Sequence, residues 1–211
     1  MATDDAKRFP IVLVRHAEPV QLPPGTGSHW TDTELSDLGR RQAACVADRL
    51  AREIGSTPVR IVASDLKRAA QTAQAIAARL GASVETTGEL REFNDGCGEV
   101  NPGDAIAAQA GRGETWAAFY ARVNVCLARL AAEQDRLLIV VSHYGTAMNL
   151  VNGWLGLGLN EAGDIRVSFG SHLTGVSVLR VDRRGKHVLE RLNDTSHLDA
   201  AGLGQSLGLS E

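Results

Sequence analysis

The fold is decided by the stretch FPIVLVRH at residues 9–16, an apolar run that ends in Arg15 and His16. A second apolar run covers residues 137–141 and leads through a serine to His143. Short continuous apolar runs are typical of strands that are buried on both faces of a parallel sheet. Open α/β sheets bind ligands at the carboxyl ends of their strands. We therefore expect His16 and His143 to lie in one crevice.

Strands and helices alternate along the chain, and the apolar residues of the helices follow the 3.6-residue period. Besides the strands at 9–14 and 137–141, the expected elements are a helix over 36–54 capped by Ser36, a strand over 59–63, a helix over 66–80, a third strand-like segment before residue 90, helices over about 115–134 and 146–155, and a β-hairpin over 176–192. This order predicts an α/β fold. It is a three-layer sandwich in which a mostly parallel sheet carries helices on both faces and has an antiparallel edge.

Length and composition fit one globular domain. A chain of 211 residues can bury a sizeable core, and its 44% hydrophobic and 22% charged residues are ordinary proportions. We predict a single domain over residues 1–211, with its core at about 9–198 and a flexible, glycine-rich tail at 199–211. The formal net charge of -3 argues against a nucleic-acid partner, because binding to the phosphate backbone requires a basic face.

The cysteines and the first residues restrict cofactors and location. Cys45, Cys97 and Cys126 form no Cys-x-x-Cys pair, so neither a disulfide framework nor a zinc site is expected. Residues 1–8 are polar and lack the apolar core of a signal peptide, and no apolar run is long enough to span a bilayer. We expect a cytoplasmic protein without a membrane partner.

The residues at the strand ends suggest phosphoryl chemistry. A neutral imidazole such as that of His16 can attack phosphorus, and the resulting phosphohistidine divides a hydrolysis into two displacements. Arg15 and Arg68, the latter in the segment SDLKR at 64–68, offer planar guanidinium groups that can each bind two phosphoryl oxygens. His143 offers a further donor. This scheme requires no metal and no cofactor.

One carboxyl group must protonate the leaving oxygen and later accept a proton from water. Glu92 is our candidate for both tasks, because it lies in the loop after the third strand-like segment and precedes the aromatic residue Phe93. Asp95 in the same loop is the alternative acid.

Several short segments follow one another in a characteristic order from about residue 11 to about residue 198. They are VRHAE at 14–18, WTDTELSDLG at 30–39, SDLKRAAQTA at 64–73, LRE at 90–92, GET at 113–115 and VSHYG at 141–145. Together they resemble the histidine phosphatase superfamily, the phosphoglycerate mutase-like enzymes. The resemblance implies a phosphoglycerate mutase-like fold and His16 as the phosphorylated residue. It also implies Arg15, Arg68 and His143 as the phosphate pocket and Glu92 as acid and base.

The sequence departs from the family pattern at two positions. Ala17 stands where the family has glycine, which adds a methyl group beside the nucleophile and restricts the backbone turn. Tyr144 stands where glycine is common, and its ring could narrow the pocket or offer a hydroxyl group to the substrate.

Basic side chains are sparse in the loops that should surround the site. A mutase must hold two phosphates, which calls for several additional cations. The loops at 19–32 and 93–113 contain only His29 and Arg112 as basic residues. We therefore expect a small phosphorylated metabolite with a neutral or apolar leaving group, in a site lined by the side chains of Trp30, Phe93 and Tyr144.

Three interpretations of the function stay open. The first is a phosphomonoester hydrolase that acts through a phosphohistidine, the second a phosphoglycerate mutase-like phosphotransferase, and the third a catalytically silent phosphate-binding module. His172 and His197 are further candidates for the rim of the site. The apolar segment 154–159 is expected to pack either a substrate loop or a second copy of the chain in a homodimer.

Overall fold

A computed structural model describes residues 9–22, 30–96, 113–133 and 135–204. One six-stranded sheet has the strand order β3-β2-β4-β1-β5-β6. The strands are β1 (Ile11–Arg15), β2 (Val59–Ser64), β3 (Val84–Thr87), β4 (Leu137–Ser142), β5 (Val176–Val181) and β6 (His187–Asp194). Strands β1 to β4 are parallel, whereas β5 pairs antiparallel with both β1 and β6. The predicted fold class is confirmed.

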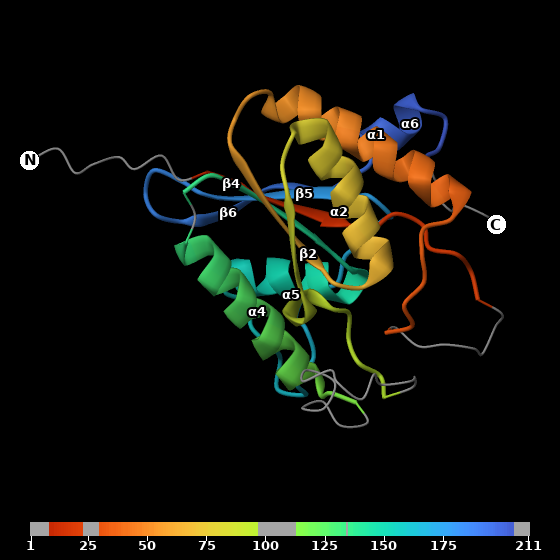
Figure 1. Cartoon of the computed structure of the whole chain (residues 1–211). Coiled ribbons are helices and arrows are strands. Elements are labelled where there is room, and N and C mark those ends of the chain that lie inside the picture. Colours follow the sequence, from red (N-terminus) through yellow and green to blue (C-terminus); the bar gives the residue numbers. More distant parts are fainter. Residues whose placement is uncertain (1–8, 23–29, 97–112, 134, 205–211) are drawn as a thin grey trace, which may run out of the picture.

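Helices cover both faces of the sheet. They are α1 (Asp37–Ile54), α2 (Lys67–Leu80), α4 (Trp116–Ala132), α5 (Tyr144–Trp154) and α6 (Ser196–Ala200), with a short 3-10 helix, η1 (Gly88–Leu90). Figure 1 shows α1 and α2 on one side of the strands and α4 and α5 on the other. The molecule is therefore the three-layer sandwich that the sequence predicts.

The side chains of β1 alternate between the two layers of helices. Val12 and Val14 pack with residues of α1 and α2, whereas Ile11 and Leu13 pack with residues of α4 and α5. All four side chains are almost completely buried. A shift of the strand by one residue would exchange the two faces, so this packing fixes the register of β1 and with it the position of Arg15.

The parallel pairing of β1 and β4 brings the two strand-end histidines together. Arg15 lies opposite Ser142 in the ladder. The backbone N–H of His16 then donates to the carbonyl of Ser142 at 2.9 Å. Each histidine therefore leaves the sheet at the same edge, one residue beyond its strand.

The beginnings of two helices show what the sequence pattern can and cannot indicate. Ser36 caps α1 as predicted, because its Oγ accepts a hydrogen bond from the Gly39 N–H at 2.9 Å. Helix α5 begins at Tyr144, which corrects the expected start at Thr146. His143 occupies the cap position of this helix with extended backbone angles. Residues in the first turn of α5 contact the site as well as the core. The spacing of apolar residues therefore does not reveal where this helix begins.

Ordered packing continues past the expected end of the core. Leu198 of α6 is buried, and the N–H of Leu203 donates to its carbonyl at 2.8 Å. The tail predicted for 199–211 thus begins inside a packed turn, and residues 205–211 lie outside the described part of the chain. In the apolar segment at 154–159, Trp154 is buried against His187 at 4.0 Å between ring centroids, and Leu155 is exposed. Among the described helices, none combines the length and apolarity that crossing a membrane requires.

Candidate active site

His16 and His143 form the centre of the candidate site. Their ring centroids lie 5.1 Å apart, and both side chains are buried. The Nδ1 atom of His16 lies 2.8 Å from the carbonyl oxygen of Ala17. A carbonyl oxygen only accepts hydrogen bonds, so Nδ1 must carry the proton. This arrangement leaves the Nε2 atom of His16 with a lone pair.

Burial and neighbouring cations keep both imidazoles uncharged. The pKa of His16 lies well below its ordinary value, first because burial disfavours the imidazolium and then because Arg68 and Arg15 are close. Burial likewise lowers the pKa of His143, and Arg68, His16 and Arg15 add to the effect. Neutral His16 is a competent nucleophile, and neutral His143 still offers one N–H donor.

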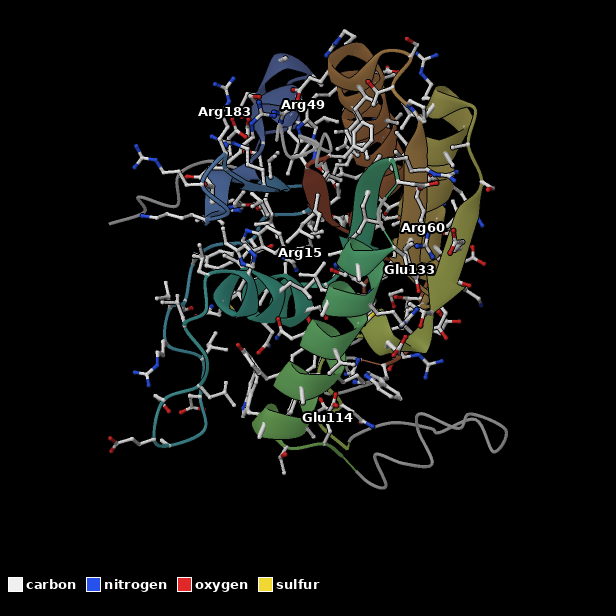
Figure 2. The ribbon with its side chains drawn as sticks, turned by 90° about the vertical axis from the view of Figure 1, so that its left-hand side faces the viewer. Arg15, Arg49, Arg60, Glu114, Glu133 and Arg183 are labelled. Carbon is white, nitrogen blue, oxygen red and sulfur yellow. The ribbon has the colours of Figure 1, made fainter. Side chains whose placement is uncertain are left out.

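Two arginines lie beside the imidazoles, Arg15 partly buried and Arg68 buried. Arg15 follows from the end of β1, donates from Nη1 to the carbonyl of Ser171, and places its guanidinium 5.3 Å from the ring centroid of Tyr144. Figure 2 shows Arg15 in the middle of the molecule, in contrast to Arg183 at the periphery. Arg68 lies in the first turn of α2 and donates from Nη1 to the carbonyl of Thr31 at 2.9 Å.

The charges of these arginines are coupled to one carboxylate. Burial lowers the pKa of Arg15 and of Arg68, whereas the charge of Glu92 raises both. Glu92 therefore acts on the same site as the two guanidinium groups. The structure brings together all five residues that the sequence analysis assigns to catalysis and phosphate binding.

Glu92 reaches the site from the loop after η1. Its Oε2 accepts from the backbone N–H of Gly145 at 2.9 Å, and its Oε1 accepts from the N–H of Phe93 at 3.0 Å. A Cβ atom on Gly145 would lie only 2.5 Å from Glu92 Oε1, so the close approach of the carboxyl group requires glycine here. Asp95, the alternative acid, is exposed further along the loop.

Arg122 of α4 holds the loop that carries Glu92, and sequence reasoning missed it. It donates to the carbonyls of Glu89 at 2.8 Å, Arg91 at 3.2 Å and Glu92 at 3.3 Å. It also forms a salt bridge with Glu114 from the segment GET, and the side chains of both partners are largely buried. The spacing in α4 could have identified it, since Arg122 lies one helical turn after the core residue Phe119 and therefore on the same face of the helix.

The three predicted substrate-lining residues have different surroundings. Tyr144 reaches Arg15 with its ring, and its hydroxyl donates to the carbonyl of Phe169 at 3.4 Å. Trp30 donates from Nε1 to the carbonyl of Glu92 at 2.7 Å, which supports the loop. Phe93 stacks on Trp116 of α4 with 4.5 Å between ring centroids. The ring of Tyr144 is thus next to a phosphate-pocket arginine, and a lining role for each of the three remains a prediction.

Ala17 fits its turn without backbone strain. Its φ is negative. In the described part of the chain, Thr174 and Asn193 are the only non-glycine residues with a positive φ. The N–H of Ala17 donates to Thr72 Oγ1 at 3.0 Å, and the residue packs with Leu35 and Ala43. The additional methyl group is therefore accommodated between α1 and α2.

Several buried nitrogen atoms of the site have no protein partner among the described residues. They are Nε of Arg15 and both ring nitrogens of His143. Buried polar groups are normally hydrogen-bonded, so a cluster of orphaned nitrogens next to cations indicates a place for an anionic ligand. The same part of the chain contains no cluster of three His, Cys, Asp or Glu side chains arranged to hold a metal ion.

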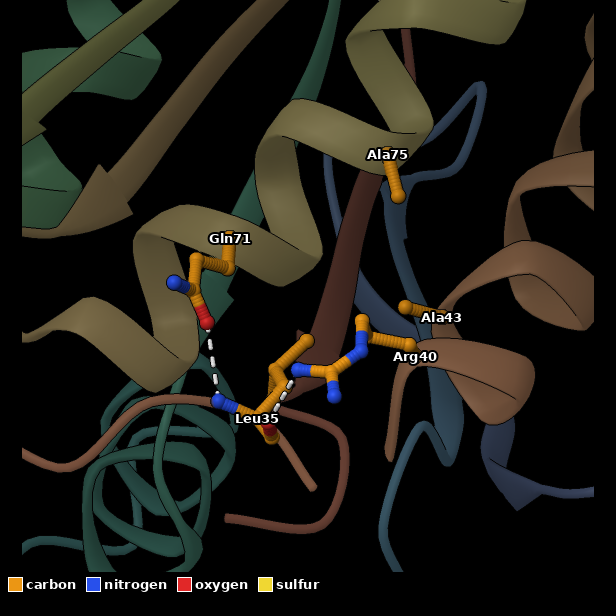
Figure 3. A pocket seen from close by; sticks show the side chains of 5 residues that line it. All are labelled: Leu35, Arg40, Ala43, Gln71 and Ala75. Carbon is orange, nitrogen blue, oxygen red and sulfur yellow. Dashed lines mark hydrogen bonds between the residues drawn. The ribbon is translucent and has the colours of Figure 1, made fainter. Parts of the chain in front are cut away.

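A cavity of about 320 Å³ lies elsewhere, between α1 and α2. Figure 3 shows its lining residues, Leu35, Arg40, Ala43, Gln71 and Ala75. None of them belongs to the histidine and arginine cluster. Gln71 and Arg40 both bond to the backbone of Leu35, so the polar groups of this cavity stabilise the loop before α1.

The two candidate rim histidines have different surroundings. His172 is exposed, and its backbone N–H donates to Asn193 Oδ1 at 2.7 Å. His197 is buried and contacts Thr174 and Arg49. A position at the rim of the site stays a prediction for both histidines.

Known proteins share this sequence pattern and fold. The chain matches the sequence model of the histidine phosphatase superfamily (branch 1) over residues 11–195. It is 33% identical over 220 residues to a probable phosphoglycerate mutase from Yersinia enterocolitica, which covers 92% of this chain and 97% of the relative. A mycobacterial glucosyl-3-phosphoglycerate phosphatase is similar in structure with a TM-score of 0.68 and 26% identity, covering 88% of this chain and 98% of that one. A phosphoserine phosphatase from Entamoeba histolytica is similar with a TM-score of 0.69 and 25% identity, covering 90% and 99%.

Proposed function

This chain belongs to the histidine phosphatase superfamily, and we propose that it hydrolyses a small phosphorylated metabolite through a phosphohistidine on His16. One observation carries the proposal. The Nδ1 proton of His16 is directed to the carbonyl of Ala17, so the lone pair of Nε2 is available for attack, beside Arg15, Arg68 and His143.

In the first step, Nε2 of His16 attacks phosphorus while the bond from phosphorus to the leaving oxygen breaks. Arg15 and Arg68 stabilise the charge on the phosphoryl oxygens, and the N–H of neutral His143 donates to one of them. Glu92 delivers a proton to the leaving oxygen, which departs as an alcohol.

In the second step, a water molecule attacks the phosphohistidine. The Glu92 carboxylate accepts a proton from this water as the new oxygen–phosphorus bond forms and the nitrogen–phosphorus bond breaks. The products are inorganic phosphate and His16 with its lone pair restored. The same carboxyl group thus serves as acid and base in turn, without a metal ion or cofactor in the scheme.

The pairing of nearby cations favours hydrolysis over mutase activity. Arg91 next to Glu92 makes two hydrogen bonds of 2.7 Å with the Asp65 carboxylate. Arg122 pairs with Glu114. Cations that are already neutralised in this way offer little to a second phosphate group, which a mutase must hold. We therefore propose a monoester with a neutral or apolar leaving group, which Tyr144 would contact.

The mutase alternative rests on a different observation, the 33% identity to a probable phosphoglycerate mutase. The structural relatives are phosphatases by name, one for glucosyl-3-phosphoglycerate and one for phosphoserine. These names supply the first esters to test on this chain, together with 3-phosphoglycerate.

The test is phosphate release from p-nitrophenyl phosphate and from these esters in the presence of EDTA. We expect release by the wild type, loss of release and of an acid-labile phosphoenzyme in His16→Ala, and a fall of about 100-fold or more in Glu92→Gln. His187→Ala is the matched control, because this exposed histidine stacks on Trp154, the last residue of α5, whereas the site lies at the first residues of that helix. Isomerised 3-phosphoglycerate without phosphate release would establish the mutase. The absence of both phosphate release and a phosphoenzyme would establish the silent module.

A further inference from the structure

A strained turn lies directly behind the proposed nucleophile. Thr174, just before β5, has a φ of 56°, in the left-handed region that β-branched residues rarely adopt. Thr174 is fully buried. Strained backbone of this kind persists only where its surroundings determine it, and it is found preferentially at functional sites.

The strained turn fastens the backbone of the two strand-end residues. The N–H of Thr174 donates to the carbonyl of Arg15 at 3.1 Å and, with a longer distance of 3.4 Å, to that of His16. The next residue, Gly175, accepts from the Arg15 N–H at 3.3 Å. Arg15 is thus held on both sides, and the peptide unit that joins it to His16 cannot rotate without breaking these bonds.

A buried histidine holds the side chain of Thr174. The Nε2 atom of His197 lies 2.9 Å from Thr174 Oγ1, and its Nδ1 atom lies 3.2 Å from Nη1 of Arg49. A guanidinium nitrogen only donates, so Nδ1 of His197 accepts and Nε2 carries the proton. His197 therefore donates to the Thr174 hydroxyl as a neutral imidazole.

Arg49 fixes this histidine in turn. Its side chain is only 6% exposed and forms salt bridges with Glu53 of α1 at 2.7 Å and with Asp194 of β6 at 2.6 Å. Figure 2 shows Arg49 among the C-terminal elements, on the side of the molecule away from Glu114. Burial and the charge of Arg49 lower the pKa of His197 to about 4, which agrees with the neutral tautomer that the contacts require.

We propose that Thr174 and His197 are positioning residues that hold His16 and Arg15 in the geometry for phosphoryl transfer. The inference rests on the proposed function of His16. Neither residue touches the substrate in this scheme. Their contribution is to keep the left-handed turn in place, because loss of the His197 donor leaves the buried Thr174 hydroxyl unpaired and lets the turn relax. Displacement of a reacting group by about 1 Å can cost up to about 100-fold in rate.

Paired variants at both positions test this role. Thr174→Val and His197→Leu remove the hydrogen bond, whereas Thr174→Ser and His197→Gln keep a hydroxyl and a donor. We expect the first two to lower kcat for p-nitrophenyl phosphate by about 10-fold or more and the second two to stay within about threefold of wild type. Ser177→Ala is the matched control, because it also removes a buried hydroxyl, which accepts from Asn193 N–H at 3.0 Å.

A second readout does not depend on turnover. The imidazole ¹⁵N resonances of His16 and the dissociation constant for inorganic phosphate are measured by NMR in each variant, and unfolding midpoints record stability. We expect Thr174→Val and His197→Leu to shift the His16 signals and weaken phosphate binding by about 3- to 10-fold, with no such change in Ser177→Ala. An inactive wild type would refute the proposed function but leave this comparison valid. The positioning role is refuted if both variants match Ser177→Ala in kcat and in the His16 resonances, or if His197 carries its proton on Nδ1.

Discussion

The replacement Gly145→Ala tests the placement of Glu92 without removing its carboxyl group. A Cβ atom at this position would lie 2.5 Å from Glu92 Oε1 and 3.3 Å from the ring of Phe119, whereas ordinary contacts begin at 3.4 Å. The carboxyl group must therefore retreat by roughly 1 Å to restore normal van der Waals contact. The 2.9 Å hydrogen bond from Gly145 N–H to Oε2 is then stretched out of range.

The size of the effect follows from the task of the carboxyl group. A positioned general acid contributes about 10²- to 10⁴-fold to the rate, and a displacement of about 1 Å can forfeit 10²-fold. We expect Gly145→Ala to lower kcat by about 10- to 100-fold for an alkyl phosphate, whose leaving oxygen requires protonation. For p-nitrophenyl phosphate the loss should be smaller, because its leaving group departs readily as an anion.

The assay compares kcat for both esters in Gly145→Ala, Glu92→Gln and the double variant. Gly153→Ala is the matched control, since it lies in the same helix and its Cβ would instead meet the side chain of Asn124. If Gly145→Ala acts through Glu92, the double variant loses no more than Glu92→Gln alone. Wild-type kcat for the alkyl ester in Gly145→Ala, or an equal loss in Gly153→Ala, would refute this account of the carboxyl group.

Further predictions concern the supporting loop, the phosphate pocket and acid stability. Arg122→Gln removes donors to three carbonyls of the loop and should lower kcat by about tenfold, and a change in KM alone would contradict this role. Arg68→Lys exchanges a planar fork for a point charge, so the inhibition constant of inorganic phosphate should rise about tenfold, and an unchanged constant would count against the pocket. Stability should fall as the pH drops from 6.5 to about 4, because His197 has a pKa near 4 when folded and the unfolded chain then binds protons that the native state excludes. Urea titrations of wild type and His197→Gln at pH 7 and 4.5 measure the contribution of His197 to this loss of unfolding free energy, which is about 3 kcal/mol at most. A wild-type urea midpoint that does not change with pH would contradict the prediction.

The sequence predicts the part of the site that depends on local pattern. The apolar runs before His16 and His143 locate two buried strands, and the rule that ligands bind at strand ends brings the histidines together. The parallel ladder with Arg15 opposite Ser142 confirms this placement. Ser36 is equally local, because a cap acts on a backbone N–H only three residues away.

The parts that the sequence does not predict depend on contacts between distant segments. The sequence analysis names Glu92 itself, but not the Gly145 N–H that holds its carboxyl group, and not Arg122, which reaches the same loop from α4. The turn at Thr174 is determined by His197 and by the carbonyls at the end of β1. No periodic pattern marks such residues, because each takes its position from tertiary contacts and not from the propensity of its own segment.

The site gathers positive charge away from water, and its surroundings explain how the fold tolerates this. A buried cation without partners is costly, but Arg15 and Arg68 each donate to a backbone carbonyl, and Glu92 raises the pKa of both. The charge of Asp32 also raises the pKa of Arg68, but the Asp32 carboxylate forms a salt bridge with Lys67 as well. Burial first, and then the positive charges of Arg68 and Arg15, lower the pKa of His16 and keep this imidazole neutral and therefore nucleophilic. A phosphate group is the anion that these two guanidinium groups can bind, so the cations that help to keep the nucleophile neutral also select the ligand.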